Sequence, residues 1–134
     1  MKYELLRMKV KDAKKVERFL ANTPAKLPDS ATLKDVIRKG FGIICRDRLS
    51  RKYKGVVLTY ITRKRNVIAF FYLAPEIRMK PVVRDLFSSV VKNFNKELPI
   101  HLYSTDISTF KNQVKPLNEE GMYEWVGDLS LWEQ

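Results

Sequence analysis

Three apolar segments separated by short basic turns constrain this fold more than any other feature of the sequence. FGIICRD (41–47), KGVVLTYIT (54–62) and NVIAFFYLA (66–74) are rich in β-branched and aromatic residues, as strands are. The polar turns between them are too short for a crossover, so the segments predict consecutive antiparallel hairpins. The remaining elements must pack around this meander.

The clearest helical pattern follows the meander. From Pro81 to about Lys96, apolar residues recur every three or four positions and form one continuous stripe. Pro81 suits the first helical position, because the N–H that proline lacks has no partner there. The pattern predicts a helix that covers one face of the sheet with Val83, Leu86, Phe87, Val90, Val91 and Phe94.

Weaker patterns extend the fold toward both ends of the chain. They predict a single α/β (α+β) domain over residues 1–134, with a mixed, mostly antiparallel sheet of about six to seven strands flanked by about four helices. The additional elements are a strand at 3–8, helices at 11–22 and 31–39, a strand at 99–105, a helix at about 106–115 and two closing strands, MYEWV and LSLW.

Composition limits the class of protein. No apolar run approaches the ~18 residues that a membrane helix needs, so we expect no membrane partner. The start, MKYELLRMKVKD, is not a signal peptide, and we expect a cytoplasmic location for a cellular or a phage-encoded protein. The single cysteine, Cys45, excludes an internal disulfide and a multi-cysteine zinc site. We expect it to be a buried structural thiol, and we expect no metal site.

The charge is strongly positive. The chain has 26 Lys and Arg against 15 Asp and Glu, a net charge of +11. Such an excess suits nucleic acid, an anionic surface or a phosphorylated ligand, although solubility alone is the simpler explanation. The turn after the first meander strand is the candidate polyanion site, with Arg46, Arg48, Arg51, Lys52 and Lys54.

Three stretches, in this order, resemble the GNAT superfamily of acyl-CoA-dependent N-acetyltransferases. YELLRMKVKDAKKVERFL is similar to the family's opening strand and helix, and LAPEIRMKPVVRDLF (73–87) to its strand–loop–helix with Arg/Gln-x-x-Gly-x-Gly/Ala. IHLYSTDISTFKNQVKPLNEEGMYEWVGD is similar to its closing elements. The resemblance implies that acetyl-CoA is the acyl donor and an amine the acceptor. It also implies that loop amides and the following helix receive the pyrophosphate of coenzyme A.

The coenzyme loop departs from the family motif. Arg78 matches its first position, but Pro81 stands at the first Gly and Val83 at the second small residue. Pro81 removes an N–H donor and Val83 places a branched side chain at the approach, whereas Arg78, Lys80 and Arg84 could compensate by charge. The cofactor-binding residues that the resemblance implies are Leu73, Ala74, Arg78, Met79, Lys80, Val82, Val83 and Arg84.

The catalytic candidates are His101, Glu76 and Tyr103. His101 alternates with Ile100 and Leu102, so it should face the other side of its strand, together with Tyr103. It is a general-base candidate, because histidine is the side chain that titrates near neutrality. Glu76 lies just past the strand where the family often places its base. The resemblance also implies a tyrosine acid, but Leu117 stands at that position.

These departures leave a second hypothesis open. The chain could be a catalytically inactive protein on the same scaffold that binds nucleic acid or an acidic protein partner through its basic face. Degenerate proteins similar to this family occur among phage proteins, including virion components. The closing strands would permit either a monomer or a homodimer.

Overall fold

The computed structural model describes residues 2–21, 23, 30–78, 81–103, 114–117 and 122–126. They form one mixed sheet of seven strands in the order β1-β2-β3-β4-β5-β7-β6. Only β4 and β5 run parallel; every other neighbouring pair is antiparallel. The strands are β1 (Tyr3–Arg7), β2 (Phe41–Asp47), β3 (Tyr53–Ile61), β4 (Asn66–Leu73), β5 (Ile100–Tyr103), β6 (Val114–Pro116) and β7 (Met122–Trp125).

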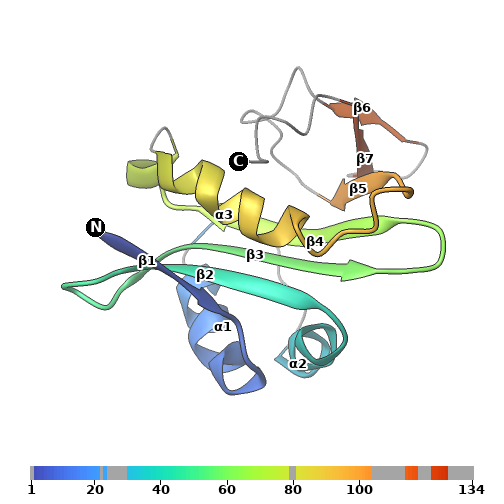
Figure 1. The fold of residues 1–134 in the computed structure, drawn as a ribbon. Helices are drawn as coiled ribbons and strands as arrows, with labels where there is room; N and C mark the ends of the chain where they lie inside the picture. The colour runs from blue at the N-terminus through green and yellow to red at the C-terminus, as the bar shows by residue number, and fades with distance from the viewer. Residues whose placement is uncertain are drawn as a thin grey trace.

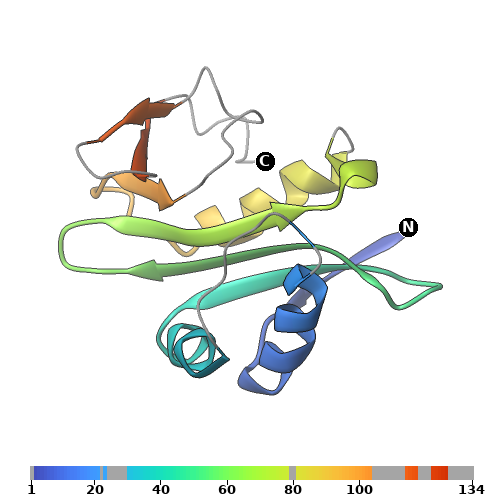
Figure 2. The same cartoon turned by 180° about the vertical axis from the view of Figure 1, so that it is seen from behind.

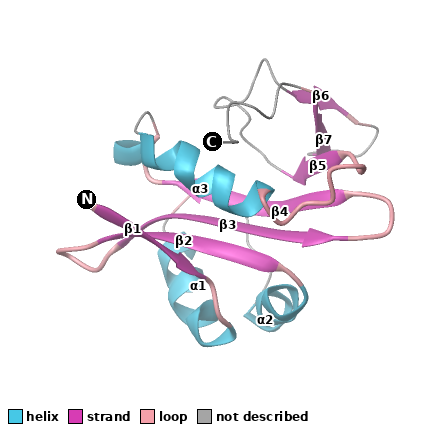
Figure 3. Cartoon of the chain, in the orientation of Figure 1, coloured by secondary structure: helices cyan, strands magenta, loops and turns pink. Residues whose placement is uncertain are grey.

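Helices cover both faces of the sheet. Figures 1 and 2 show α3 on one face and α1 and α2 on the other, and Figure 3 shows the same layers by type of element. The helices are α1 (Ala13–Ala21), α2 (Ser30–Lys39) and α3 (Pro81–Val91), with short 3-10 turns η1 (Val10–Asp12) and η2 (Pro75–Ile77). This is the predicted mixed, mostly antiparallel sheet flanked by helices, with three α-helices in the described residues where about four were expected.

Each face has its own apolar core. The alternation of the meander strands sends Ile43 and Val57 toward α3, and Ile44, Val56 and Leu58 toward α1 and α2. Phe87 at the centre of α3 is fully buried. The meander strands therefore have apolar residues on both faces, which is why they read as nearly continuous apolar runs in the sequence.

The join between α2 and β2 requires glycine. A Cβ at Gly40 would overlap the carbonyl oxygen of Thr59 and lie 2.9 Å from that of Val36. The Gly40 N–H still donates to the Val36 carbonyl, and α2 ends just before it at Lys39, where the sequence predicted its end.

The predicted helix from Pro81 to about Lys96 ends earlier than its apolar stripe. Regular helix stops at Val91, and tighter turns follow, with the N–H groups of Asn93 and Phe94 donating three residues back. Phe94 is still buried in the α3 core. The side chain of Asn66 accepts from the N–H of Asn95, four residues after the helix has ended, and fixes the segment that follows α3.

The C-terminal elements also differ from prediction. The helix expected at about 106–115 is wrong at its end, because Val114 and Lys115 belong to strand β6. Pro116 fits there, since an edge strand tolerates a residue without an N–H. The rest of that helix and the closing strand LSLW lie outside the described residues. MYEWV is confirmed as β7, and the strand expected at 99–105 is confirmed as the shorter β5.

Candidate functional site

The candidate site begins where β4 and β5 part. Their register covers three pairs, from Asn66 with Ile100 to Ile68 with Leu102, whereas β4 continues to Leu73. The pairing of β4 with β3 skips Ala69, which places a bulge at the point where the two parallel strands stop pairing. A bulge re-aims a strand, and bulges are frequent beside active sites. The backbone of β4 from Ala69 to Leu73 thus has no pairing partner among the described residues of β5.

The turn after β4 is held by a residue of β3. Lys54 is skipped in the register of β2 with β3, its carbonyl accepts from the Ala74 N–H, and its Nζ lies 2.7 Å from Glu76 Oε1. The hydrogen bond from Lys54 lowers the pKa of Glu76, and the same bond raises the pKa of Lys54. Glu76 is therefore a weaker base than a free carboxylate, and its visible role is to fix η2.

Arg78 folds back over the end of β4. Its Nε donates to the Leu73 carbonyl at 3.0 Å, and its guanidinium lies 5.9 Å from the centre of the Tyr72 ring. The Leu73 and Ala74 side chains are themselves buried. The structure thus brings Arg78 to the junction of β4, η2 and α3 that the sequence predicted for it.

The first turn of α3 directs its branched side chains into the core and away from the helix end. Pro81 is exposed at the first helical position, and Arg84 is exposed in the first turn. The Val83 side chain is directed into the α3 core and Val82 packs against the same core, so neither branched side chain occupies the helix end. Met79 and Lys80 lie outside the described residues. The positive end of this 11-residue helix suits an anion, with one amide fewer because of Pro81.

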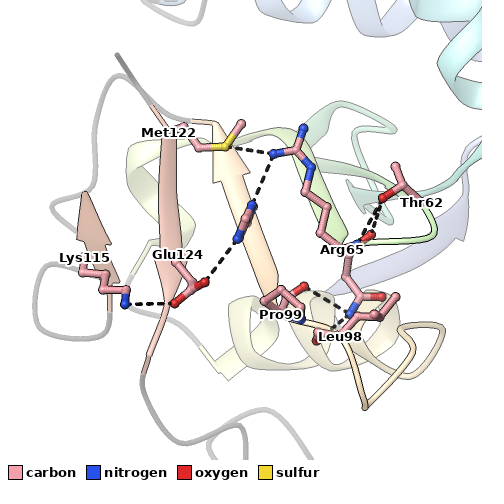
Figure 4. A network of polar contacts seen from close by, with 9 residues as sticks. Thr62, Arg65, Leu98, Pro99, Lys115, Met122 and Glu124 are labelled. Carbon is pink, nitrogen blue, oxygen red and sulfur yellow. Dashed lines mark hydrogen bonds and ion pairs between the residues drawn. The ribbon is translucent and has the colours of Figure 1, made fainter. Parts of the chain in front are cut away.

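His101 is the centre of a polar network on the face of the sheet opposite α3. As predicted, Ile100 and Leu102 are buried against α3 and His101 points the other way. Its Nδ1 lies 3.2 Å from Arg65 Nη1, and its Nε2 lies 3.2 Å from Glu124 Oε1. Lys115 contacts the other oxygen of Glu124 at 3.3 Å, and Arg65 also donates to the Met122 sulfur (Figure 4).

The partners of His101 fix its tautomer. Arginine can only donate, so Nδ1 accepts from Arg65 and the ring proton sits on Nε2, facing Glu124. Burial raises the pKa of Glu124, but the hydrogen bonds from Lys115 and His101 and the charge of Lys115 outweigh burial and hold the pKa below its usual value. Both ring nitrogens are thus engaged. His101 can accept a substrate proton only after Arg65 releases Nδ1.

His101 and Glu76 lie at different places along β4. His101 pairs with Val67 near the start of the strand, and Glu76 follows its end at Leu73. Six residues of strand separate these points by about 20 Å. Tyr103 ends β5 in register with Met122, and its side chain lies outside the described part of the structure. The predicted catalytic residues do not converge on one point.

The basic turn between β2 and β3 is partly neutralised. Arg46 contacts Glu4 at 2.6 Å, Arg51 lies 3.7 Å from the same carboxylate, and Lys54 is committed to Glu76. Arg48 and Lys52 are exposed.

Sequence reasoning missed three kinds of participant. Glu4 and Glu124 were not recognised, because each meets its partner only through strand register: Glu4 opposite Arg46, and Glu124 opposite His101. Arg65 was assigned to a surface turn, although it reaches His101 from there. The cations of α1 were not considered, although Lys15 and Arg18 line a cavity with the basic turn. Only a correct strand register could have signalled the two glutamates.

Two further observations bound the site. No three His, Cys, Asp or Glu side chains within the described ranges come together as a metal site requires. Of the helices that the structure describes, none is both long enough and apolar enough to cross a membrane.

The comparisons with known proteins give similarity in structure but not in sequence. No protein-family model matches this chain, and no curated protein sequence matches it. Among solved structures, NAA60 of Arabidopsis thaliana in complex with a bisubstrate analogue is similar over 94% of this chain and 99% of its own, with a TM-score of 0.68 at 12% identity.

One bacterial and one archaeal structure are similar to this chain as well. An acetyltransferase of the GNAT family from Staphylococcus aureus is similar over 92% of this chain and 98% of its own, with a TM-score of 0.65 at 11% identity. Ard1 of Thermoplasma volcanium is similar over 92% and 95%, with a TM-score of 0.62 at 14% identity. The order of the strands, the parting of β4 from β5 and these similarities lead to one conclusion: this chain has the fold of the GNAT acetyltransferases.

Proposed function

We propose that this protein transfers an acyl group from an acyl-CoA to an amine. The observation that carries the proposal is that, among the described residues, β4 pairs with β5 over three residues only and then runs directly into the η2 turn and the start of α3. The named acetyltransferases with the same fold support this reading, and one of them holds a bisubstrate analogue.

The proposed donor site fits an elongated ligand that ends in phosphates. The β4 backbone from Ala69 to Leu73 offers amide and carbonyl groups to the amide-rich arm of coenzyme A. Arg78 and the start of α3 offer positive charge to the pyrophosphate. Pro81 removes one donor, and because Val83 turns inward, its branched side chain does not block an anion.

The acyl-CoA would supply an activated thioester carbonyl. In the transfer, a C–N bond forms, the C–S bond breaks, the amine loses a proton and the thiolate gains one. The chain would bind and orient both reactants, which by itself is a large part of such catalysis. His101 could act as the base only if Arg65 moved away from Nδ1, and its two hydrogen bonds argue against that role. Glu76 fits this role less well, because Lys54 already occupies its carboxylate.

Calorimetric titration with acetyl-CoA tests the proposal. We expect saturable binding, and we expect Arg78→Ala to weaken it about ten- to a hundred-fold, as removal of a charge-assisted hydrogen bond does. Arg38→Ala is the matched control, because Arg38 is an exposed arginine of α2 on the other face of the sheet. An absence of heat at millimolar acetyl-CoA would end the acyltransferase proposal.

A second candidate function is binding without catalysis on the same scaffold. Pro81 and the two engaged nitrogens of His101 favour it, since the first weakens the phosphate cradle and the second withholds the base. Acetyl-CoA binding that is never followed by release of free thiol, with any amine offered, would support this candidate. Steady thiol release that depends on the amine would exclude it.

A further inference from the structure

A basic groove lies between α1 and the edge of the sheet formed by β1, β2 and β3. It consists of two adjoining cavities of about 710 and 550 Å³ that share Lys15, Arg46 and Tyr53. Figure 2 shows α1 alongside these strands, near the turn between β2 and β3. The groove is therefore on the opposite face of the sheet from α3 and its proposed phosphate cradle.

The walls of the groove concentrate positive charge. Eight cationic side chains line the two cavities, against one acidic side chain, Asp12. Among described residues, Lys15, Arg18 and Lys52 form no ion pair, so their charge is available to a ligand. The cations are Arg7, Lys9, Lys11, Lys15, Arg18, Arg46, Arg51 and Lys52.

Part of this charge is held in place before any ligand binds. Glu4, directly across the β1–β2 pair, bonds both Nε and Nη2 of Arg46 at 2.7 and 2.6 Å. In the turn, the Asp47 carboxylate accepts from the N–H groups of Leu49 and Ser50, and Arg51 adopts φ 64°. A non-glycine residue with this φ is uncommon, and here the turn places Arg51 beside the groove. Ordered cations bind with less entropic cost than free side chains do.

Aromatic rings line the same groove. Tyr53 and Phe19 both border the larger cavity, with ring centroids 6.1 Å apart in an edge-to-face contact. Phe19 also packs on Tyr72, with ring centroids 5.7 Å apart, and this second contact holds the Phe19 ring in place. Burial is the main cause that raises the pKa of Tyr53, so its phenol stays neutral beside an anion. Rigid rings between cations suit a ligand with flat bases and phosphates.

We infer that this groove binds single-stranded nucleic acid. Cations along a groove follow the phosphates, and aromatic rings that border it, here the half-buried Tyr53 and Phe19, stack bases without sequence preference. A double helix is read by an element that enters its major groove, whereas here the protein presents a concavity between a helix and a sheet edge. An acidic peptide would use the cations but has no bases for Tyr53. The inference is independent of acyl transfer, because it uses neither Arg78 nor the β4–β5 opening.

Fluorescence anisotropy with a labelled oligo-dT or oligo-U of about 12 nucleotides tests the inference. We expect the double variant Arg18→Ala/Lys52→Ala to bind at least about tenfold more weakly at low salt. Its plot of log affinity against log salt should flatten by roughly 0.7 for each phosphate that the variant no longer neutralises. The matched control is Arg63→Ala/Lys64→Ala, which removes the same two residue types from the exposed turn between β3 and β4. That control should bind like the parent protein.

Equal losses of affinity in the two double variants would show that only net charge matters, and the inference would be overturned. The same holds if no oligonucleotide binds even at low salt.

A second measurement separates nucleic acid from other polyanions. Tyr53→Phe should bind like the parent, whereas Tyr53→Ala should lose roughly five- to a hundred-fold in affinity, as the loss of one stacked base predicts. Thermal unfolding of Tyr53→Ala checks that the groove still folds. If polyglutamate of equal charge or a duplex displaces the oligonucleotide as well as an unlabelled copy does, the groove is a general anion surface and the inference fails.

Discussion

The side chain of Asn66 forms a two-way link with the backbone of Asn95. Asn66 Nδ2 donates to the Asn95 carbonyl at 2.8 Å, and its Oδ1 accepts from the Asn95 N–H at 2.9 Å. Nδ2 also lies 3.1 Å from the Leu98 carbonyl (Figure 4), and the whole residue is buried. The link ties the first residue of β4 to the segment that leads into β5. It therefore sets the register of the only parallel pair in the described sheet, from which the β4–β5 opening begins.

We predict that Asn66→Ala lowers the free energy of unfolding by about 2–3 kcal/mol, because it leaves buried backbone groups without partners. Chemical denaturation measures the change. Asn93→Ala is the control: Asn93 is exposed and bonds only within its own turn, to Ser89, so its loss should cost less than about 0.5 kcal/mol. Similar costs for the two variants would show that the Asn66 link contributes little.

Much of the fold could be predicted because the meander carries its own pattern. The strand predicted at 41–47 has those bounds in the structure, and the other two meander strands agree within one residue. Buried strands of this kind are specified by local runs of β-branched and aromatic residues. The start of α3 at Pro81 could also be predicted from local sequence, because a proline and the beginning of the apolar stripe mark it.

What could not be predicted depends on contacts distant in sequence. Strand β6 has three residues and is held by its pairing with β7, so it is too short to show a periodic pattern of apolar residues in the sequence. The path of the chain after α3 is fixed by Asn66, which lies far earlier in the chain. The site shows the same division: Arg78 lies between β4 and α3 because it directly follows η2 in the sequence, whereas the partners of His101 and Glu76 come from strand register and a bulge.

For acyl transfer, we predict that His101→Gln lowers kcat by less than about tenfold and leaves the pH dependence of kcat/KM unchanged. The reason is that Arg65 occupies Nδ1 and the proton on Nε2 faces Glu124, so the ring has no free acceptor. A working general base raises the rate about a hundred- to ten-thousand-fold, and its own titration appears in the plot of kcat/KM against pH. The test is the rate of the parent protein and of His101→Gln, measured as a function of pH. A hundredfold loss of rate, together with loss of one titration from the pH dependence, would establish His101 as the base.

Asp47 makes the β2–β3 turn sensitive to acid. The backbone hydrogen bond from Ser50 is the largest cause that lowers the Asp47 pKa, with Leu49, the Ser50 hydroxyl and Lys2 adding to it and burial opposing it. Because the folded pKa lies below the ordinary 3.8, the stabilisation is present above about pH 3.8 and is lost as the pH falls through the folded value. Asp47→Asn should thus lower the unfolding temperature at neutral pH, and the difference should shrink in acid.

The control for Asp47 is Asp35→Asn. Asp35 is an exposed carboxylate on α2 that pairs with Lys39 four residues later, and such surface pairs contribute little. We expect its unfolding temperature to follow that of the parent protein at every pH. An Asp47→Asn difference that persists unchanged in acid would mean that the charge of Asp47 is not what holds the turn.

Cys45 should report on opening of the α3 core. The residue is fully buried between β1 and β3, and burial raises the pKa of its thiol to about 11. Since the thiolate is the reactive form, only about one thiol in a thousand would be ionised at pH 8, and the reagent must also reach it. We predict that iodoacetamide modifies the folded protein at least about a hundredfold more slowly than the unfolded protein, measured by mass spectrometry, and that Cys45→Ser takes up no label.

The same thiol links stability to alkaline pH. Because the folded pKa exceeds the ordinary 9.0, the neutral thiol stabilises the fold below about pH 9, and this contribution is lost as the pH rises toward 11. Labelling should therefore accelerate in that range faster than the ionisation of a free thiol alone would allow. Labelling of the folded protein at the unfolded rate near neutral pH would place Cys45 at the surface and contradict the packing of β2 against α3.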